Sequence, residues 1–210
     1  MVAALPGIAL HLSLPWAWQV REIALYQMPG DTTIHVQYLW WNLNRLESGD
    51  ITLARAQDGA NVLDHNAVFS EYLGLYSISG KLHSATRADG TYFVGGYYSS
   101  DRKEPAQYGQ GRPPEARALH SASDDPHCAV LAAHYRMNPG VRGTGRIAGY
   151  RVLHYDSDGQ TLSFAPGLNC TVLKATVLER GRFGIPVEAG TWEVTSVVRG
   201  QPDPRLFVAP

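Results

Sequence analysis

The chain has 210 residues, a formal net charge of −1 and only 18% charged residues. Proteins that hold nucleic acid mainly through its phosphates usually carry a basic excess, so the charge balance argues against such binding over the whole surface. No stretch reaches the ~18 apolar residues of a membrane span, and the apolar N-terminus lacks the basic start of a signal peptide. We therefore expect no membrane association and a cytoplasmic location.

The first segments of the chain are expected to be strands. Apolar residues alternate with small or polar ones over residues 8–14, which is the period-two pattern of a half-buried strand. Residues 20–28 fit a second strand, and the Pro29-Gly30-Asp31 sequence that follows is a turn signal.

The third segment is ambiguous between strand and helix. Over residues 33–41 a strand would place on one face Ile34, Val36, Tyr38 and Trp40. Parts of residues 32–47 also fit helical spacing, so a helix stays an alternative. We favour a strand that ends in an irregular or short helical exit, followed by a short strand at residues 51–56.

The middle of the chain contains the clearest hairpin. Residues 58–66 are polar and turn-rich, and residues 66–73 fit one or two helical turns. Strand-like runs at residues 73–86 and 91–100 are joined through Asp89-Gly90, and Asp-Gly between such runs is a strong hairpin signal.

A long loop is expected at residues 101–126. This segment holds four prolines and almost no large apolar residues. It greatly exceeds the usual loop length of about four to six residues, and such loops are either functional or disordered. We expect it to cover the mouth of a binding site.

The C-terminal part repeats the strand pattern. Asp158-Gly159 predicts a second hairpin between residues 147–155 and 160–164. Other strands are expected at residues 128–137, 171–179 and 191–198, with a glycine-rich stretch at 140–149 and an extended tail. About ten short strands with one or two short helices predict an antiparallel barrel or a two-sheet sandwich, formed by residues 1–210 as a single domain.

Aromatic residues give the leading functional hypothesis. Large rings beside the Gly95-Gly96 gap suit a flat or apolar ligand, although ordinary core packing explains aromatic residues in strands equally well. We expect a small-molecule pocket lined by Tyr38, Trp40, Tyr97 and Tyr98.

Enzymatic activity is left open by the sequence. Non-redox acid–base chemistry of a cyclase, isomerase or lyase type would need one acid and one base. The candidates are His35, His134 and Glu193. Glu22 and Glu193 each interrupt an apolar strand and are the carboxylates expected to be buried, where a raised pKa suits such a role.

A competing hypothesis rests on the stretch GVRGTGRIAGYRVL at residues 140–153. Arg142, Arg146 and Arg151 and the backbone amides around them could hold phosphate. The stretch resembles the glycine-rich loop of the RNA-binding proteins of CRISPR effector complexes, which implies an RNA-binding subunit. A structural or assembly subunit is the third alternative, and the oligomeric state is not predicted.

Cysteine and histidine residues point to no cofactor. Cys128 and Cys170 could pair with each other, but two buried thiols are the favoured interpretation because two cysteines in 210 residues are no disulfide framework. His120, His127 and His134 match no tight metal-binding motif. We therefore expect neither a metal site nor a cofactor.

Overall fold

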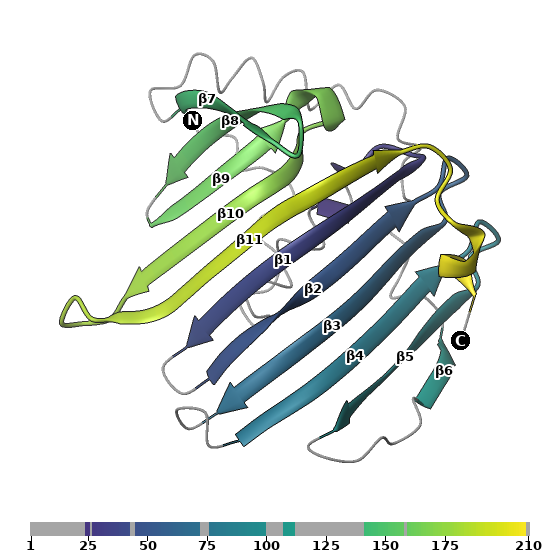
Figure 1. The fold of residues 1–210 in the computed structure, drawn as a ribbon, viewed down its shortest axis with the longest axis horizontal. Helices are drawn as coiled ribbons and strands as arrows, with labels where there is room; N and C mark the ends of the chain where they lie inside the picture. Colours follow the sequence, from purple (N-terminus) through teal and green to yellow (C-terminus); the bar gives the residue numbers. More distant parts are fainter. Residues whose placement is uncertain are drawn as a thin grey trace, which may run out of the picture.

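The strands of the protein form one antiparallel sheet (Figure 1). The computed structural model describes residues 24–25, 27–42, 45–71, 76–99, 107–111, 141–157 and 159–208. These residues contain 11 strands in the order β6-β5-β4-β3-β2-β1-β11-β10-β9-β8-β7. The mainly β, antiparallel fold class predicted from the sequence is confirmed.

Some strands are longer than expected, and β11 reaches 14 residues. Their bounds are β1 Thr32–Asn42, β2 Arg45–Arg55, β3 Asn61–Glu71, β4 Tyr76–Thr86, β5 Tyr92–Ser99, β6 Gln107–Gly111, β7 Val141–Ile147, β8 Tyr150–Ser157, β9 Gln160–Ala165, β10 Thr171–Arg180 and β11 Pro186–Arg199. The described residues also contain two 3₁₀ helices, η2 at Pro166–Leu168 and η3 at Pro204–Phe207.

The sheet consists of two meanders. Strands β1 to β6 lie side by side in chain order, and so do β7 to β11. The pairing of β1 with β11 joins the two meanders at the centre of the sheet. Because β6 and β7 stand at opposite edges, the described strands form an open, barrel-like sheet and not two facing sheets.

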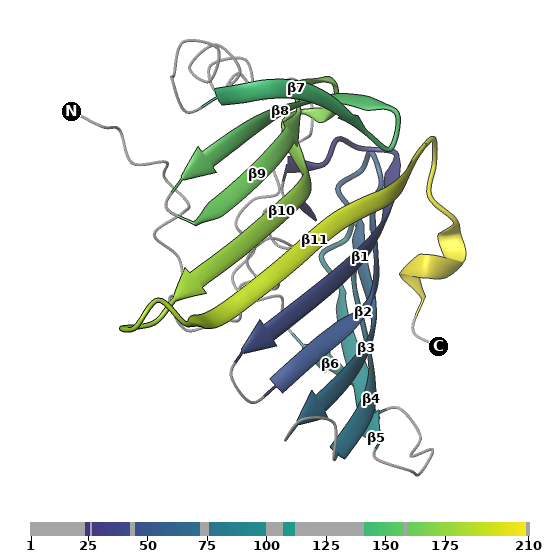
Figure 2. The same ribbon diagram turned by 60° about the vertical axis from the view of Figure 1, so that its left-hand side comes forward.

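The sheet is strongly curved. In Figure 2, the upper parts of β2 to β5 are seen almost edge-on, while β7 to β9 turn across the top of the sheet. Glycine permits close backbone approach in this sheet: a Cβ atom on Gly49 would lie 2.0 Å from the Asn66 carbonyl oxygen, and one on Gly96 would lie 2.2 Å from that of Lys81.

The main core lies on the concave side of the sheet. On β1, Ile34, Val36, Tyr38 and Trp40 are buried, while the residues between them are exposed, as the period-two pattern predicts. The core continues to Val152 on β8 and Phe164 on β9, so it spans both meanders. Buried Ala24 and Met28 also belong to it.

A smaller apolar cluster lies on the outer face. It joins Ala54, Val62 and Ala85 of β2, β3 and β4 to the partly buried Leu206 and Phe207. The tail was expected to be extended, but residues 204–207 form η3. Asp203 caps this helix by accepting a hydrogen bond from the Arg205 amide, 2.9 Å away.

Two local predictions are wrong, and a third holds only in part. Residues 24, 25 and 27 are helical, within a segment expected to be a strand. Residues 66–71 belong to β3, which runs without a break from Asn61, so the expected helical turns are absent and the expected turn is confined to the residues before Asn61. Pairing with β2 and β4 along the whole of β3 overrides the polar composition that suggested a turn.

Other predictions are confirmed or lie outside the described residues. Both Asp-Gly hairpins are present, as β4–β5 and β8–β9. The expected loop at 101–126 contains β6, and its other residues are not described, nor are the strands expected at 8–14 and 128–137. Cys170 is disulfide-bonded and is therefore not the free thiol that was expected.

Candidate functional site

Three polar side chains form a buried hydrogen-bonded cluster on the concave face. The Tyr38 hydroxyl donates to Glu47 Oε1 at 2.8 Å and lies 2.6 Å from His65 Nε2. These residues come from β1, β2 and β3, and each is at most 5% exposed. We call Tyr38, Glu47 and His65 the polar cluster.

The strand register explains how one tyrosine contacts two strands. Tyr38 faces Gly49 on β2, and Gly49 faces Ala67 on β3. Residues directly opposite in an antiparallel pair share a face, so a side chain at position 49 would stand between Tyr38 and β3. Glycine places no side chain there, so the backbone of β3 approaches Gly49 closely and the hydroxyl of Tyr38 reaches His65.

An arginine lies beside the buried carboxylate. Arg45 Nη2 is 3.7 Å from Glu47 Oε2, and the Arg45 guanidinium lies 4.4 Å from the centre of the Phe69 ring. A carboxylate removed from water is costly unless it is hydrogen-bonded or paired. Tyr38 and Arg45 both meet that requirement for Glu47.

Trp192 adds an unpaired donor next to the polar cluster. It faces Tyr38 from β11 and is fully buried. Its indole Nε1 has no hydrogen-bond partner in the part of the chain that the structure describes. By contrast, the Nε1 of Trp40 donates to Glu188 Oε1 at 2.6 Å.

The predicted ligand-binding residues fall into two groups. Tyr38 and Trp40 are buried in the main core. Tyr97 and Tyr98 lie on β5, where their backbone positions pair with Lys81 and Gly80. Position 98 thereby ends a cross-strand row that begins at Tyr38 and passes through Gly49, Ala67 and Gly80. The role of these four residues in binding stays a prediction.

Two of the predicted catalytic residues lie on the outer face. His35 is exposed, and its Nδ1 is 3.1 Å from Thr52 Oγ1. The Glu193 side chain is 51% exposed and forms a 2.7 Å ion pair with Lys174, so its expected burial is wrong. Period two places it outside because its neighbours Trp192 and Val194 point inward. His134 and Glu22 lie outside the described residues.

Sequence reasoning missed Glu47, His65 and Trp192. A signal existed for His65, because the alternation of Leu63, His65, Ala67 and Phe69 marks one face of a strand. The turn-rich composition nearby concealed it. No comparable signal identified Glu47, whose burial depends on its partners across the sheet.

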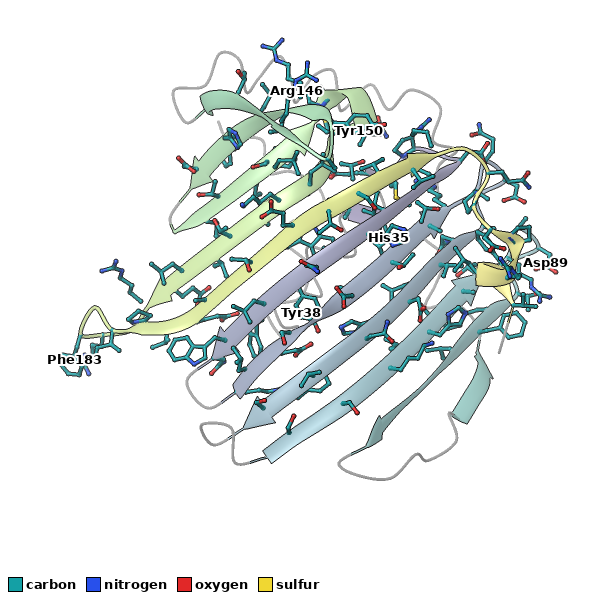
Figure 3. All side chains as sticks on the ribbon, in the orientation of Figure 1. His35, Tyr38, Asp89, Arg146, Tyr150 and Phe183 are labelled. Carbon is teal, nitrogen blue, oxygen red and sulfur yellow. The ribbon has the colours of Figure 1, made fainter. Side chains whose placement is uncertain are left out.

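The arginines of the competing hypothesis are partly brought together. Arg146 on β7 pairs in register with Arg151 on β8, and both are exposed. Arg142 lies on β7. Figure 3 shows Arg146 and Tyr150 at this end of the sheet, far from Phe183 at the tip of the β10–β11 hairpin.

A second pair of titratable groups lies on the outer face. Asp64 Oδ1 is 3.8 Å from His83 Nδ1, and His83 is buried. The His83 imidazole lowers the pKa of Asp64, and partial burial of the carboxyl opposes this effect. Lys81 also contributes to the lowered pKa.

The remaining features suggest no further chemistry. A pocket of about 290 Å³ lies on the outer side, where Arg87, Pro202 and Phe207 contribute to its lining, away from the predicted aromatic pocket. No group of three or more His, Cys, Asp or Glu residues able to hold a metal is found among the described residues. The same residues include no helix that is long and apolar enough to cross a bilayer.

No protein-family model and no curated protein sequence matches the chain. Solved structures with a similar fold include the complex of MucA and MucB from Pseudomonas aeruginosa, with 14% identity over 92% of this chain and 60% of that chain and a TM-score of 0.39. A second MucB structure, in complex with MucA(peri), has 15% identity over 92% of this chain and 59% of that chain, with a TM-score of 0.39.

A third similar structure is a β-barrel-like protein of a domain of unknown function, DUF1849, from Brucella abortus. It has 6% identity over 82% of this chain and 99% of that chain, with a TM-score of 0.42. The chain thus spans about three fifths of the two MucB-containing chains. At these identities the likeness concerns the fold alone.

Proposed function

We propose that the concave face of the sheet binds a small, largely apolar or aromatic molecule that carries a hydrogen-bond acceptor. The observation that carries this proposal is the fully buried indole N–H of Trp192 beside the polar cluster, which has no hydrogen-bond partner among the described residues. A buried donor without an acceptor costs about 1–3 kcal/mol, and each such group in a native protein requires an explanation. A ligand acceptor placed at Trp192 would remove that cost.

The surroundings of Trp192 suit the proposed ligand. Aliphatic and aromatic side chains dominate the core around it, and small-molecule sites are mostly apolar with a few convergent polar groups. The polar cluster supplies such groups on the neighbouring strands. A carbonyl, ether or acid oxygen meets the indole donor, and the body of the ligand packs on the apolar side chains.

Proton transfer to such a ligand would fall to the polar cluster. Tyr38 and His65 are in hydrogen-bonding contact and buried, whereas His35 and Glu193 face solvent on the opposite side of the sheet. Acid–base chemistry benefits from groups held in fixed geometry away from water. The predicted cyclase, isomerase or lyase activity is therefore assigned to Tyr38 and His65 in this proposal.

The test uses 1-anilinonaphthalene-8-sulfonate, an aromatic anion with acceptor oxygens. Titration of the whole chain should give saturable probe fluorescence with quenching of tryptophan emission. Trp192→Phe keeps an aromatic ring but removes the donor, so probe affinity should fall by about three- to tenfold, the value of one hydrogen bond. Tyr38→Phe, which breaks the polar cluster, should weaken binding by a similar factor.

Trp41→Phe is the matched control, because Trp41 is only partly buried and alternates with the inward-facing Trp40. It should bind the probe as the unaltered chain does. Unchanged affinity in Trp192→Phe, or equal loss in Trp41→Phe, would contradict the proposal.

RNA binding is the second candidate, supported by the exposed Arg146 and Arg151 that face each other across β7 and β8. A single-stranded RNA probe should then bind with an affinity that falls steeply as salt rises. Arg146→Ser together with Arg151→Ser should abolish that salt dependence. Binding of the aromatic probe should depend little on salt.

A further inference from the structure

The β10–β11 hairpin carries an exposed apolar tip. Phe183 is 86% exposed and Ile185 is 61% exposed, which makes them the two most exposed large hydrophobic residues of the described chain. Figures 1 and 2 show the hairpin extending beyond the neighbouring strands, and Figure 3 places Phe183 at its far end. Single exposed hydrophobic residues are ordinary, but two at the end of a projecting hairpin form a local apolar surface.

The tip has a defined turn. The Gly181 amide donates to the Ile185 carbonyl at 2.8 Å, and the Gly184 amide donates to the Gly181 carbonyl at 2.9 Å. Gly184 has a φ of 74°, which glycine adopts without strain. The turn therefore holds the Phe183 and Ile185 side chains away from the core of the protein.

Basic residues surround the apolar tip. Arg180 and Arg182 are exposed. Neither forms a salt bridge among the residues that the structure describes, unlike Lys174 farther down the same hairpin. Glu179 on β10 and Glu188 on β11 are cross-strand partners. This acidic pair lies farther from the tip than the two arginines do.

We propose that this tip inserts into the interface of a bilayer that contains anionic lipid. Phenylalanine and isoleucine would enter the boundary between headgroups and acyl chains, and the two arginines would remain among the anionic headgroups. A projecting tip enters a fluid bilayer without a preformed pocket, because lipids rearrange around the inserted side chains. The site is separate from the concave face, so this proposal does not depend on ligand binding there.

The proposal departs from the expectation of no membrane association. That expectation came from the lack of an apolar stretch long enough to span a membrane. The length of apolar stretches does not report two apolar side chains and two arginines at an exposed hairpin tip, because the exposure of the tip is a property of the fold.

The test is co-sedimentation of the whole chain with vesicles of phosphatidylcholine, either pure or mixed with phosphatidylserine. Binding is expected to the mixed vesicles only and to weaken as salt rises. The double variant Phe183→Ser with Ile185→Ser should bind at least about tenfold more weakly. Val198→Ser is the matched control, because Val198 is 54% exposed on β11 but lies near its other end.

The contribution of charge is tested by Arg180→Ser with Arg182→Ser, with Arg205→Ser as a control for an exposed arginine outside every proposed site. The tip pair should lose binding by about tenfold and the control should not. Circular dichroism and thermal unfolding should be unchanged in all variants because the altered side chains are exposed.

Three outcomes of the vesicle experiments would overturn the proposal. These are no binding to the mixed vesicles, equal binding by the double apolar variant, and equal losses in the control variants. Size-exclusion chromatography without vesicles separates a further possibility. If the chain self-associates and the double apolar variant does not, the tip contacts a second copy of the chain and the membrane proposal is wrong.

Discussion

Neighbouring residues of β3 place polar side chains on opposite faces of the sheet. His65 belongs to the concave polar cluster, and its neighbour Asp64 points to the outer face beside His83. Because successive side chains alternate between faces, one strand supplies a titratable group to each side of the sheet. The polar cluster and the Asp64–His83 pair can therefore be tested independently.

Asp64 should stabilise the fold at neutral pH and lose this effect in acid. The His83 imidazole lowers the pKa of Asp64 in the folded protein below its ordinary value of 3.8. A lowered folded-state pKa gives stability that is fully present above the unfolded pKa and is lost as pH falls through the folded pKa. Asp64→Asn should thus lower the free energy of unfolding at pH 7, by less than about 1 kcal/mol because solvent screens the pair.

Thermal unfolding of both proteins from neutral to acidic pH measures this effect. The difference between them should shrink as the pH falls below about 4. Asp50→Asn, at an exposed position on β2, is the control and should show a smaller difference. A difference that is constant with pH would show that Asp64 acts through packing and not through its charge.

Side-chain burial was predictable only where the strand pattern alone decides it. The alternation of Ile34, Val36, Tyr38 and Trp40 predicted their common face. The same rule places the Glu193 side chain on the other face of β11 from Trp192. Burial of Glu193 was predicted instead because this glutamate interrupts an apolar run. Burial of Glu47 depends on the Tyr38 hydroxyl and the Arg45 guanidinium, and no local pattern contains those partners.

Among the elements, the β7–β8 hairpin depends on the backbone geometry of its turn. Ala148 and Gly149 form its tip with φ angles of 47° and 84°. Positive φ at both central residues is the geometry of a type I′ turn, which favours Asn-Gly. The sequence predicted the two Asp-Gly hairpins, but Ala-Gly is a weak turn signal and this hairpin was not predicted.

Ala148→Asn should therefore stabilise the protein. Asparagine tolerates the left-handed region that costs alanine about 1 kcal/mol, which corresponds to a rise of about 2–4 °C in the midpoint of thermal unfolding. Ala88→Asn is the matched control, because Ala88 lies in the β4–β5 turn without a positive φ. A gain at both positions would point to a general surface effect and not to turn geometry.

Gly49 should tolerate no side chain. A Cβ atom there would lie 2.0 Å from the Asn66 carbonyl oxygen and 3.0 Å from Ala67 Cα, and both atoms belong to the backbone of β3. Gly49→Ala should lower the free energy of unfolding in urea by about 1–3 kcal/mol, the range for overpacking a core. Ser48→Ala, on the same strand, should have little effect. Equal stability of Gly49→Ala would show that β2 and β3 separate easily.

At the scale of the whole molecule, the topology could not be predicted from the sequence. Local patterns located most strands, but the central pairing joins Thr32 to Arg199 and continues along the full length of β1. That pairing brings Tyr38 opposite Trp192 and so creates the candidate site. Contacts between such distant segments follow from burying one shared apolar face, which no short window of sequence reports.

Cys170 provides the test of how the whole fold is stabilised. It is disulfide-bonded and buried, and the only other cysteine of the sequence is Cys128. A disulfide restricts the unfolded chain and typically contributes about 2–4 kcal/mol. Reduction should therefore lower the midpoint of thermal unfolding by roughly 5–10 °C. Cys170→Ala should unfold like the reduced protein and should not respond to reductant.

The same measurement bears on the cytoplasmic location expected from the sequence. Disulfides persist in oxidising compartments and are rare in the cytoplasm, where thiols are kept reduced. A chain that loses its fold on reduction at physiological temperature would need an oxidising compartment, because the cytoplasm would hold it unfolded. A chain that stays folded and keeps its probe affinity when reduced is compatible with the cytoplasm. If Cys170→Ala responds to reductant as the unaltered chain does, the change in unfolding temperature does not come from the disulfide. The measurement would then say nothing about the compartment.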